Sequence, residues 1–159
     1  DFDLYAAKHM MERTGRSFDE ILGDLATKSG LLGLSGLSGD IRDLYESAAQ
    51  GNDRAQLTLE VYVASIRHAL GAYLVELGGA DAIVFTGGIG ENGIAVRRDV
   101  CRNLEELGIV LDETKNEATR GCEARLDAET SRTAIWIVPT NEELIVARLA
   151  AATLQVKDL

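Results

Sequence analysis

The sequence has little of what a disulfide framework, a metal cluster or a membrane anchor would need. Its 159 residues include two cysteines, Cys101 and Cys122, without a second pair of metal-ligating residues. Isolated thiols of this kind are typical of reduced cysteines in an intracellular protein. The longest apolar runs, such as 134–139, are much shorter than the ~20 residues of a membrane-spanning helix. We therefore expect a cytoplasmic protein that does not enter a membrane.

Positive charge is also scarce. The chain has 16 Lys and Arg residues against 26 Asp and Glu residues, and its formal net charge at pH 7 is -10. Because nucleic-acid binding gains most from clustered cations that neutralise phosphates, we do not expect nucleic acid as a partner. An acidic protein can still bind a single nucleotide through backbone N–H groups and a metal ion. The chain begins with Asp1 rather than Met, so we expect a fragment or processed product.

What is present is typical of a globular protein with one domain's length, because 46% of the residues are hydrophobic and 26% are charged. Two short β-rich runs, at 81–86 and 133–138, alternate with segments of helical periodicity. This alternation predicts an α/β fold. Helices are expected at 4–13, 17–29, 40–50, 59–77, 95–107 and 142–155, with Gly15 ending the first, a capping box of Ser17 and Glu20 beginning the second, and Asn141 capping the last. The Gly- and Ser-rich segment 31–39 is expected to be a packed loop, 109–111 a short strand and 115–130 a polar loop.

The sharpest local pattern is the glycine-rich stretch from Gly87 to Gly93, which follows the strand at 81–86. Glycines there let backbone N–H groups approach phosphate oxygens without a Cβ in the way, and a following helix adds favourable partial charge. The stretch also matches the G-x-G-x-x-G pattern of a Rossmann-type, NAD-binding oxidoreductase module, with Asp112 as the ribose-binding acid. Glu91 argues against that interpretation, because its carboxylate would repel a pyrophosphate. From spacing alone, a Rossmann module, another nucleotide-binding loop and a structural turn all stay open.

Four motifs taken together are more specific than the glycines. They are the segment 29–36 (Ser-Gly-Leu-Leu-Gly-Leu-Ser-Gly), the triplet 40–42 (Asp-Ile-Arg), the segment 82–92 with Val96-Arg97, and the segment 137–143 (Ile-Val-Pro-Thr-Asn-Glu-Glu). In this order and at these intervals they resemble the acetate/propionate kinase (acetokinase) family, over essentially the whole chain. The resemblance implies that residues 1–159 are the C-terminal nucleotide-binding portion of a carboxylate kinase. The implied fold is an actin/sugar-kinase-like (ribonuclease H-like) α/β domain with an incomplete sheet, and the N-terminal domain is absent.

The resemblance also implies a reaction and a site. Members of the family transfer the γ-phosphoryl group of ATP reversibly to acetate or another short carboxylate, with Mg²⁺, and give an acyl phosphate. The resemblance places Asp40, Ile41 and Arg42 beside the adenine and ribose. It places five residues around the base, sugar and phosphates: Gly88, Ile89, Gly90, Glu91 and Asn92. Glu142 matches the magnesium-associated glutamate of the family, with Glu143 as the alternative.

These residues also have structural explanations. Asp40 can cap its helix, Arg42 can pair with Glu46 one turn further on, and Glu142 and Glu143 can be first-turn carboxylates. The family's catalytic residues and carboxylate pocket lie upstream, so we expect this chain alone to be inactive, with an open sheet edge and uncovered apolar faces. The resemblance further implies a homodimer. A noncatalytic regulatory or assembly subunit is the third hypothesis beside the kinase and the Rossmann module.

Overall fold

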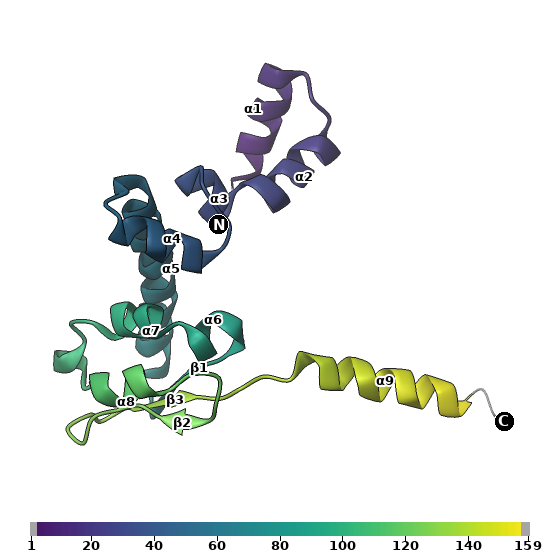
Figure 1. Cartoon of the computed structure of the whole chain (residues 1–159). Coiled ribbons are helices and arrows are strands. Elements are labelled where there is room, and N and C mark those ends of the chain that lie inside the picture. Colours follow the sequence, from purple (N-terminus) through teal and green to yellow (C-terminus); the bar gives the residue numbers. More distant parts are fainter. Residues whose placement is uncertain (1–2, 157–159) are drawn as a thin grey trace. The chain divides into compact units, whose positions relative to one another are not determined.

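The computed structural model describes residues 3–156 and divides into two compact units, Asp1–Ser65 and Ile66–Leu159. The first unit is helical, and the second holds the sheet (Figure 1). Helix α5 (Asp53–Leu77) contributes its first part to unit 1 and its remainder to unit 2. Within the described residues, no helix combines the length and the apolar character that crossing a bilayer requires.

Unit 1 contains four helices before α5, and their ends follow the capping signals of the sequence. The helices are α1 (Leu4–Thr14), α2 (Phe18–Lys28), α3 (Gly30–Ser35) and α4 (Ile41–Ala49). Helix α1 ends at Gly15, which has a left-handed backbone with φ of 68°. Helix α2 begins with the expected capping box, in which Ser17 and Glu20 each bind the other's backbone N–H. The buried apolar side chains of these helices and of the first part of α5 include Ala7, Ile21, Leu44, Ala55, Leu59 and Val63.

The expectation of a loop at 31–39 is wrong for its first half, because α3 is helical. The glycines that argued against a helix there have packing and capping roles instead. A Cβ on Gly33 would lie 2.8 Å from the carbonyl oxygen of Lys28, so glycine permits this close approach of α2 and α3. Gly36 ends α3 in the left-handed region and donates its N–H to the carbonyl of Leu32.

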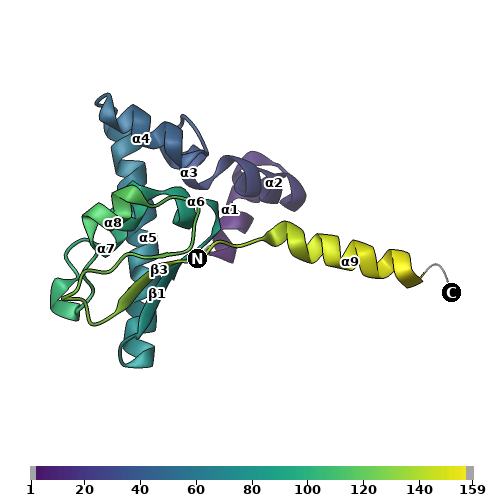
Figure 2. The same ribbon diagram turned by 60° about the horizontal axis from the view of Figure 1, so that its bottom comes forward.

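Unit 2 contains a three-stranded sheet with the order β1-β3-β2. Strands β1 (Ala82–Phe85) and β3 (Ala134–Ile137) are parallel and lie side by side in both views, whereas β2 (Ala124–Arg125) is antiparallel to β3 (Figures 1 and 2). The connecting elements are α6 (Gly87–Asn92), α7 (Ile94–Cys101), the 3₁₀ turn η1 (Glu105–Leu107) and α8 (Glu113–Ala118), and α9 (Glu142–Val156) follows β3. Strands β1 and β3 correspond to the two strands expected from the sequence, at 81–86 and 133–138.

The core of unit 2 lies between the sheet, α7 and the last part of α5. Its fully packed members are Cys101, Ile109, Leu126, Ile135 and Ile137, with Leu74 of α5 packed against them. Helix α5 is also tied to the end of α7, because Arg67 donates to the carbonyl oxygens of Val100 and Arg102 at 2.7 and 2.6 Å. This core fixes strand β1, after which the glycine-rich stretch 87–93 leaves the sheet.

Several expected boundaries in unit 2 need correction. The helix expected at 95–107 ends at Cys101, because the backbone turns at Asn103, which has φ of 58°. The segment 109–111 makes only an isolated bridge from Leu111 to Asp127 rather than a strand. The expected polar loop at 115–130 contains part of α8 and the whole of β2.

The sheet is incomplete, as the sequence implied. Among the described residues, no strand pairs with the free side of β1. Strand β1 is only half buried, and its Val84 is 52% exposed. Every described side chain of α9 is exposed, and five of them are large and apolar: Leu144, Ile145, Val146, Leu149 and Leu154. These features are typical of a domain from which covering elements are absent.

Candidate nucleotide-binding site

The glycine-rich stretch leaves the sheet at the carboxyl end of β1. Strand β1 is held to β3 as far as Phe85, whose carbonyl accepts from the N–H of Val138 at 3.0 Å. The chain then turns at Gly87, which has φ of 69°, and forms the six-residue helix α6 rather than an open loop. Residues 87–93 are called the glycine turn below. The carboxyl end of a strand in an α/β sheet is the usual place for a ligand.

Individual glycines of the turn have different roles. A Cβ on Gly90 would lie 3.2 Å from the carbonyl carbon of Phe85, so Gly90 lets the turn pack closely on the end of β1. A Cβ on Gly93 would lie 2.5 Å from the carbonyl oxygen of Ile89. At Gly88, by contrast, a Cβ would meet nothing within 4 Å. The packing of the strand and the turn therefore does not require a glycine at position 88. Because Gly88 is exposed, a ligand could approach its backbone there.

Arg97 supports the turn from inside the protein. This α7 side chain is fully buried, and its Nη1 donates to the carbonyl oxygens of Gly90 and Glu91, both at 2.9 Å. Its Nε donates to Oδ1 of Asn116 at 2.7 Å, which joins the turn to α8. Burial is the main cause that lowers the pKa of Arg97, because an apolar environment disfavours the charged guanidinium.

Glu91 and Asn92 also anchor the turn. The carboxylate of Glu91 accepts hydrogen bonds from the N–H and the hydroxyl of Thr140 through Oε1, at 2.8 and 3.1 Å. Its main-chain carbonyl accepts from the N–H of Gly121 at 3.1 Å. The side-chain amide of Asn92 donates to the carbonyl of Gly88 at 3.0 Å. Together with Arg97, these bonds hold the glycine turn to three separate segments of unit 2: helix α7, the chain at Gly121 and the chain at Thr140.

Ile89 and the start of α9 complete the candidate residues of unit 2. Ile89 is 36% exposed, so an apolar surface is available on the turn. Asn141 caps α9 as expected, because its Oδ1 accepts from the N–H of Leu144 at 3.0 Å. Glu142 is the first residue of α9, and its side chain lies outside the described part of the structure. The side chain of the alternative, Glu143, is exposed.

The predicted adenine and ribose segment lies in unit 1, at the start of α4. Asp40 caps α4 by accepting the N–H of Arg42 at 2.9 Å, and the two side chains form an ion pair. The hydrogen bond from the Arg42 guanidinium is the main cause that lowers the pKa of Asp40 to about 2. Arg42 thus pairs with Asp40 rather than with Glu46 and keeps its side chain 86% exposed. Ile41 is 7% exposed and belongs to the interior.

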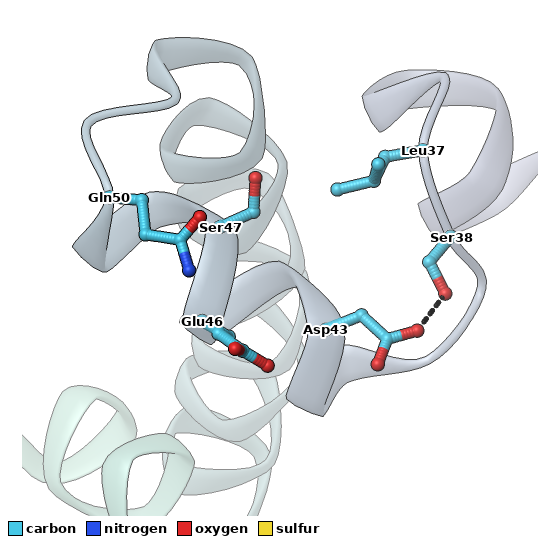
Figure 3. A pocket seen from close by; sticks show the side chains of 6 residues that line it. All are labelled: Leu37, Ser38, Asp43, Glu46, Ser47 and Gln50. Carbon is cyan, nitrogen blue, oxygen red and sulfur yellow. Dashed lines mark hydrogen bonds between the residues drawn. The ribbon is translucent and has the colours of Figure 1, made fainter.

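A hollow of about 410 Å³ lies beside this segment, between the chain at 37–38 and one side of α4 (Figure 3). Asp43 and Glu46 contribute carboxylates to its lining, and Asp43 accepts a hydrogen bond from the hydroxyl of Ser38 at 2.6 Å. Two carboxylates disfavour a phosphate and favour donors such as sugar hydroxyls or amino groups.

The structure brings some of the predicted site residues together. The Glu91–Thr140 hydrogen bonds join the glycine turn to the segment that enters α9. Asp40, Ile41 and Arg42 are consecutive residues at the start of α4 in unit 1, and a nucleotide site formed by this segment and the glycine turn stays a prediction. Arg97 and Thr140 had no predicted chemical role. The signal for Arg97 was its position beside Val96 and three residues before Val100, on the apolar side of the predicted helix, where an arginine is unusual.

The Rossmann interpretation depended on Asp112, and the structure gives this residue another role. Asp112 caps α8, and its carboxylate accepts the N–H of Lys115 at 3.0 Å. The strand expected just before it, at 109–111, is only an isolated bridge from Leu111 to Asp127. Because no strand delivers Asp112 to a ribose, the arrangement differs from the dinucleotide-binding fingerprint.

Solved structures define the class of protein to which this fold corresponds. The chain superposes on an acetate kinase from Porphyromonas gingivalis with a TM-score of 0.84 and 38% identity, over 97% of this chain and 39% of that one. A propionate kinase from Francisella tularensis gives a TM-score of 0.81 with 33% identity, over 92% of this chain and 37% of that one. The fold is therefore that of part of a carboxylate kinase, an incomplete α/β domain of the actin/sugar-kinase type, as the sequence implied.

The chain belongs to the acetokinase family, whose sequence profile matches residues 1–148. It is 49% identical over 147 residues to the acetate kinase of Natranaerobius thermophilus, covering 92% of this chain and 37% of that protein. It is 46% identical over 148 residues to the acetate kinase of Finegoldia magna, covering 93% of this chain and 37% of that protein. The chain thus spans little more than a third of the length of these curated relatives.

Proposed function

We propose that this chain supplies the adenine-nucleotide site of an ATP:acetate phosphotransferase and that it is inactive alone. In the proposed reaction, a carboxylate oxygen of acetate or a related short acid forms a bond to the γ-phosphorus of ATP. The bond between that phosphorus and the β–γ bridging oxygen breaks, and ADP leaves with the electron pair. The observation that carries the proposal is the match of residues 1–148 to the acetokinase family.

The proposed seat for the phosphates is the outer surface of the glycine turn, around Gly88, Ile89, Gly90, Glu91 and Asn92. The open space at the Cβ position of Gly88 supports this assignment, because a phosphate could approach the backbone there. The proposed seat for the base and ribose is the segment of Asp40, Ile41 and Arg42. The exposed guanidinium of Arg42 could stack on a flat base, and the polar hollow beside α4 suits sugar hydroxyls.

Mg²⁺ is part of the proposal, with Glu142 as the residue that would hold it and Glu143 as the alternative. Among the described residues, no group of three or more His, Cys, Asp and Glu side chains is arranged to hold a metal. A single glutamate still fits Mg²⁺, because this ion takes one or two protein carboxylates and completes its shell with waters and substrate phosphates. Glu91 suits the role less well, because Thr140 already donates twice to its carboxylate. When bound, the ion would neutralise charge on the phosphates.

The proposed partners follow from the length difference between this chain and its relatives. We assign the acetate pocket and the catalytic cations to a polypeptide that corresponds to the remaining part of those relatives. The free edge of β1 and the apolar side chains of α9 support this assignment, because a covering polypeptide would bury both. The homodimer and the cytoplasmic location implied by the resemblance belong to the same proposal.

Calorimetry with the purified chain tests the proposal. We expect ADP to bind and NAD not to bind, and we expect no acyl phosphate from ATP, Mg²⁺ and acetate above a control without protein. Preferential NAD binding would favour an oxidoreductase module instead. Formation of acyl phosphate by the chain alone would show that the prediction of inactivity is wrong. Co-purification of a noncatalytic complex, with no nucleotide bound, would favour the assembly-subunit hypothesis.

A further inference from the structure

Arg97 is a buried cation whose charge no carboxylate neutralises among the described residues. Its side chain has no exposed surface, and all its hydrogen bonds go to amide and carbonyl oxygens. Buried charges usually pair with an opposite charge, because the loss of hydration is otherwise costly. Here five bonds to neutral dipoles replace the water, so the positive charge itself is not cancelled locally.

The acceptors of Arg97 define what the residue organises. Nη1 binds the carbonyl oxygens of Gly90 and Glu91 in the glycine turn, and Nη2 binds those of Asn116 and Thr119 at 3.2 and 2.9 Å. Asn116 is itself fully buried and donates its side-chain amide to the carbonyl of Ile94 at 3.1 Å. The guanidinium thus connects the turn to the end of α8, and the side chain of Asn116 extends this network to the start of α7.

The charges around this group are also informative. The exposed guanidinium of Arg120 is close enough to lower the pKa of Arg97 further, after the effect of burial. The acidic group of the turn, Glu91, has its carboxylate bound to the N–H and hydroxyl of Thr140. Arg97 and Arg120 therefore place two positive charges near the glycine turn, although the net charge of the chain is -10 and the charged carboxylate of Glu91 is held by Thr140.

We propose that Arg97 is a positioning residue for nucleotide phosphates. It fixes the glycine turn through the carbonyl oxygens of Gly90 and Glu91, and its unneutralised charge favours an anion on the opposite side of the turn. This role depends on the proposed function, and it predicts selectivity for the charged nucleotide over the uncharged nucleoside. A unit charge acting across a few ångströms of partly buried protein changes anion affinity by roughly tenfold or more.

The test compares Arg97→Met with a matched control, Arg98→Met, by calorimetry with ADP and with adenosine. Arg98 is the next residue of α7, loses the same charge, and is 47% exposed with one long ion pair to Asp99 at 3.4 Å. We expect Arg97→Met to weaken ADP binding by roughly tenfold or more while adenosine affinity changes by less than about twofold. Arg98→Met should change neither affinity by more than about twofold. Equal loss of both ligands in Arg97→Met, or no loss of either, would overturn the role of the charge.

A measurement on the unmodified chain covers the case in which Arg97→Met does not fold. The Nε–H resonance of Arg97 should shift when ADP is added and stay unchanged when adenosine is added. A shift with both ligands, or with neither, would overturn the inference although ADP still binds. If the unmodified chain binds no ADP at all, the proposed function itself fails, and the role of Arg97 fails with it.

Discussion

The carboxylate of Glu91 and the backbone N–H of Thr140, from residues 49 positions apart in the chain, are joined by a hydrogen bond of 2.8 Å. The Thr140 hydroxyl donates to the same oxygen, Oε1. The sequence presented Glu91 as an obstacle to phosphate binding, because a carboxylate repels a pyrophosphate. In the structure these two neutral donors stabilise the charged carboxylate, and the carboxylate fastens the segment that enters α9 to the glycine turn.

Replacing Glu91 should therefore release this segment. In Glu91→Ala the Thr140 N–H loses its acceptor, and we expect its hydrogen exchange to accelerate by about fivefold, the effect of losing about 1 kcal/mol. Amide exchange followed by mass spectrometry or NMR measures this change. Glu129→Ala, which removes an exposed carboxylate from the same unit, should leave the Thr140 rate unchanged. Equal rates in wild type and Glu91→Ala would contradict the assigned role.

Two glycines of the turn should respond differently to a methyl group. In Gly93→Ala the new Cβ would lie 2.5 Å from the carbonyl oxygen of Ile89, so the junction of α6 and α7 must shift. We expect the free energy of unfolding to fall by about 1–3 kcal/mol. In Gly88→Ala the methyl group meets open space, and stability should change by less than about 0.5 kcal/mol.

Gly88→Ala should weaken ADP binding although it leaves stability nearly unchanged. Its methyl group would occupy the space proposed for an approaching phosphate, so we expect ADP affinity to fall while the urea unfolding curve keeps its midpoint. Calorimetry and urea titration of the same preparation measure both quantities. Wild-type ADP affinity in Gly88→Ala would show that the phosphates lie elsewhere.

The stability of unit 2 should depend on the inner side of its sheet and little on β1's exposed side. Ile135 has no exposed surface, and Ile135→Ala should lower the free energy of unfolding by about 2–5 kcal/mol. Val84 lies in the neighbouring strand and is 52% exposed, so Val84→Ala should change it by about 0.5 kcal/mol or less. Urea unfolding followed by the fluorescence of Trp136 reports on this sheet directly. Similar losses in both variants would mean that β1 packs differently.

Asp127 should make the stability of unit 2 sensitive to acid. The hydrogen bond from Arg125 is the main cause that lowers the pKa of Asp127 below its usual 3.8, and the N–H of Ile135 donates to the same carboxylate at 3.0 Å. The charged form therefore stabilises the folded state above about pH 4, and this contribution is lost as the pH falls through the lowered pKa. The urea midpoint should fall less steeply below about pH 4 in Asp127→Asn than in wild type. Glu129→Gln should keep the wild-type slope, and an unchanged slope in Asp127→Asn would refute the prediction.

Elements with local signals could be predicted from the sequence. The capping box of Ser17 and Glu20, the left-handed Gly15 and the cap of Asn141 each involve residues within one helical turn of one another. The two principal strands were predicted because they combine β-branched and aromatic residues in short apolar runs. The family resemblance added the class of fold, which no local pattern specified.

The rest depended on contacts between distant segments. Helix α3 forms despite its glycines because Gly33 packs against the chain at Lys28, and β2 exists only because β3 lies beside it. The long helix predicted through 107 stops at Cys101, since Asn103 adopts a backbone that propensity does not specify. At the site, the roles of Arg97 and Thr140 are defined by partners on other elements, so no spacing rule identifies them.

The two thiols differ in a way that is useful for experiments. Cys101 is buried, which is the main cause that raises the pKa of its thiol to about 12, whereas Cys122 is exposed. A maleimide dye added near neutral pH should therefore modify Cys122 alone, without any substitution. Cys122 follows Gly121, whose N–H is bonded to the main-chain carbonyl of Glu91, so the native sequence carries an attachment point for a fluorescent reporter directly beside the glycine turn.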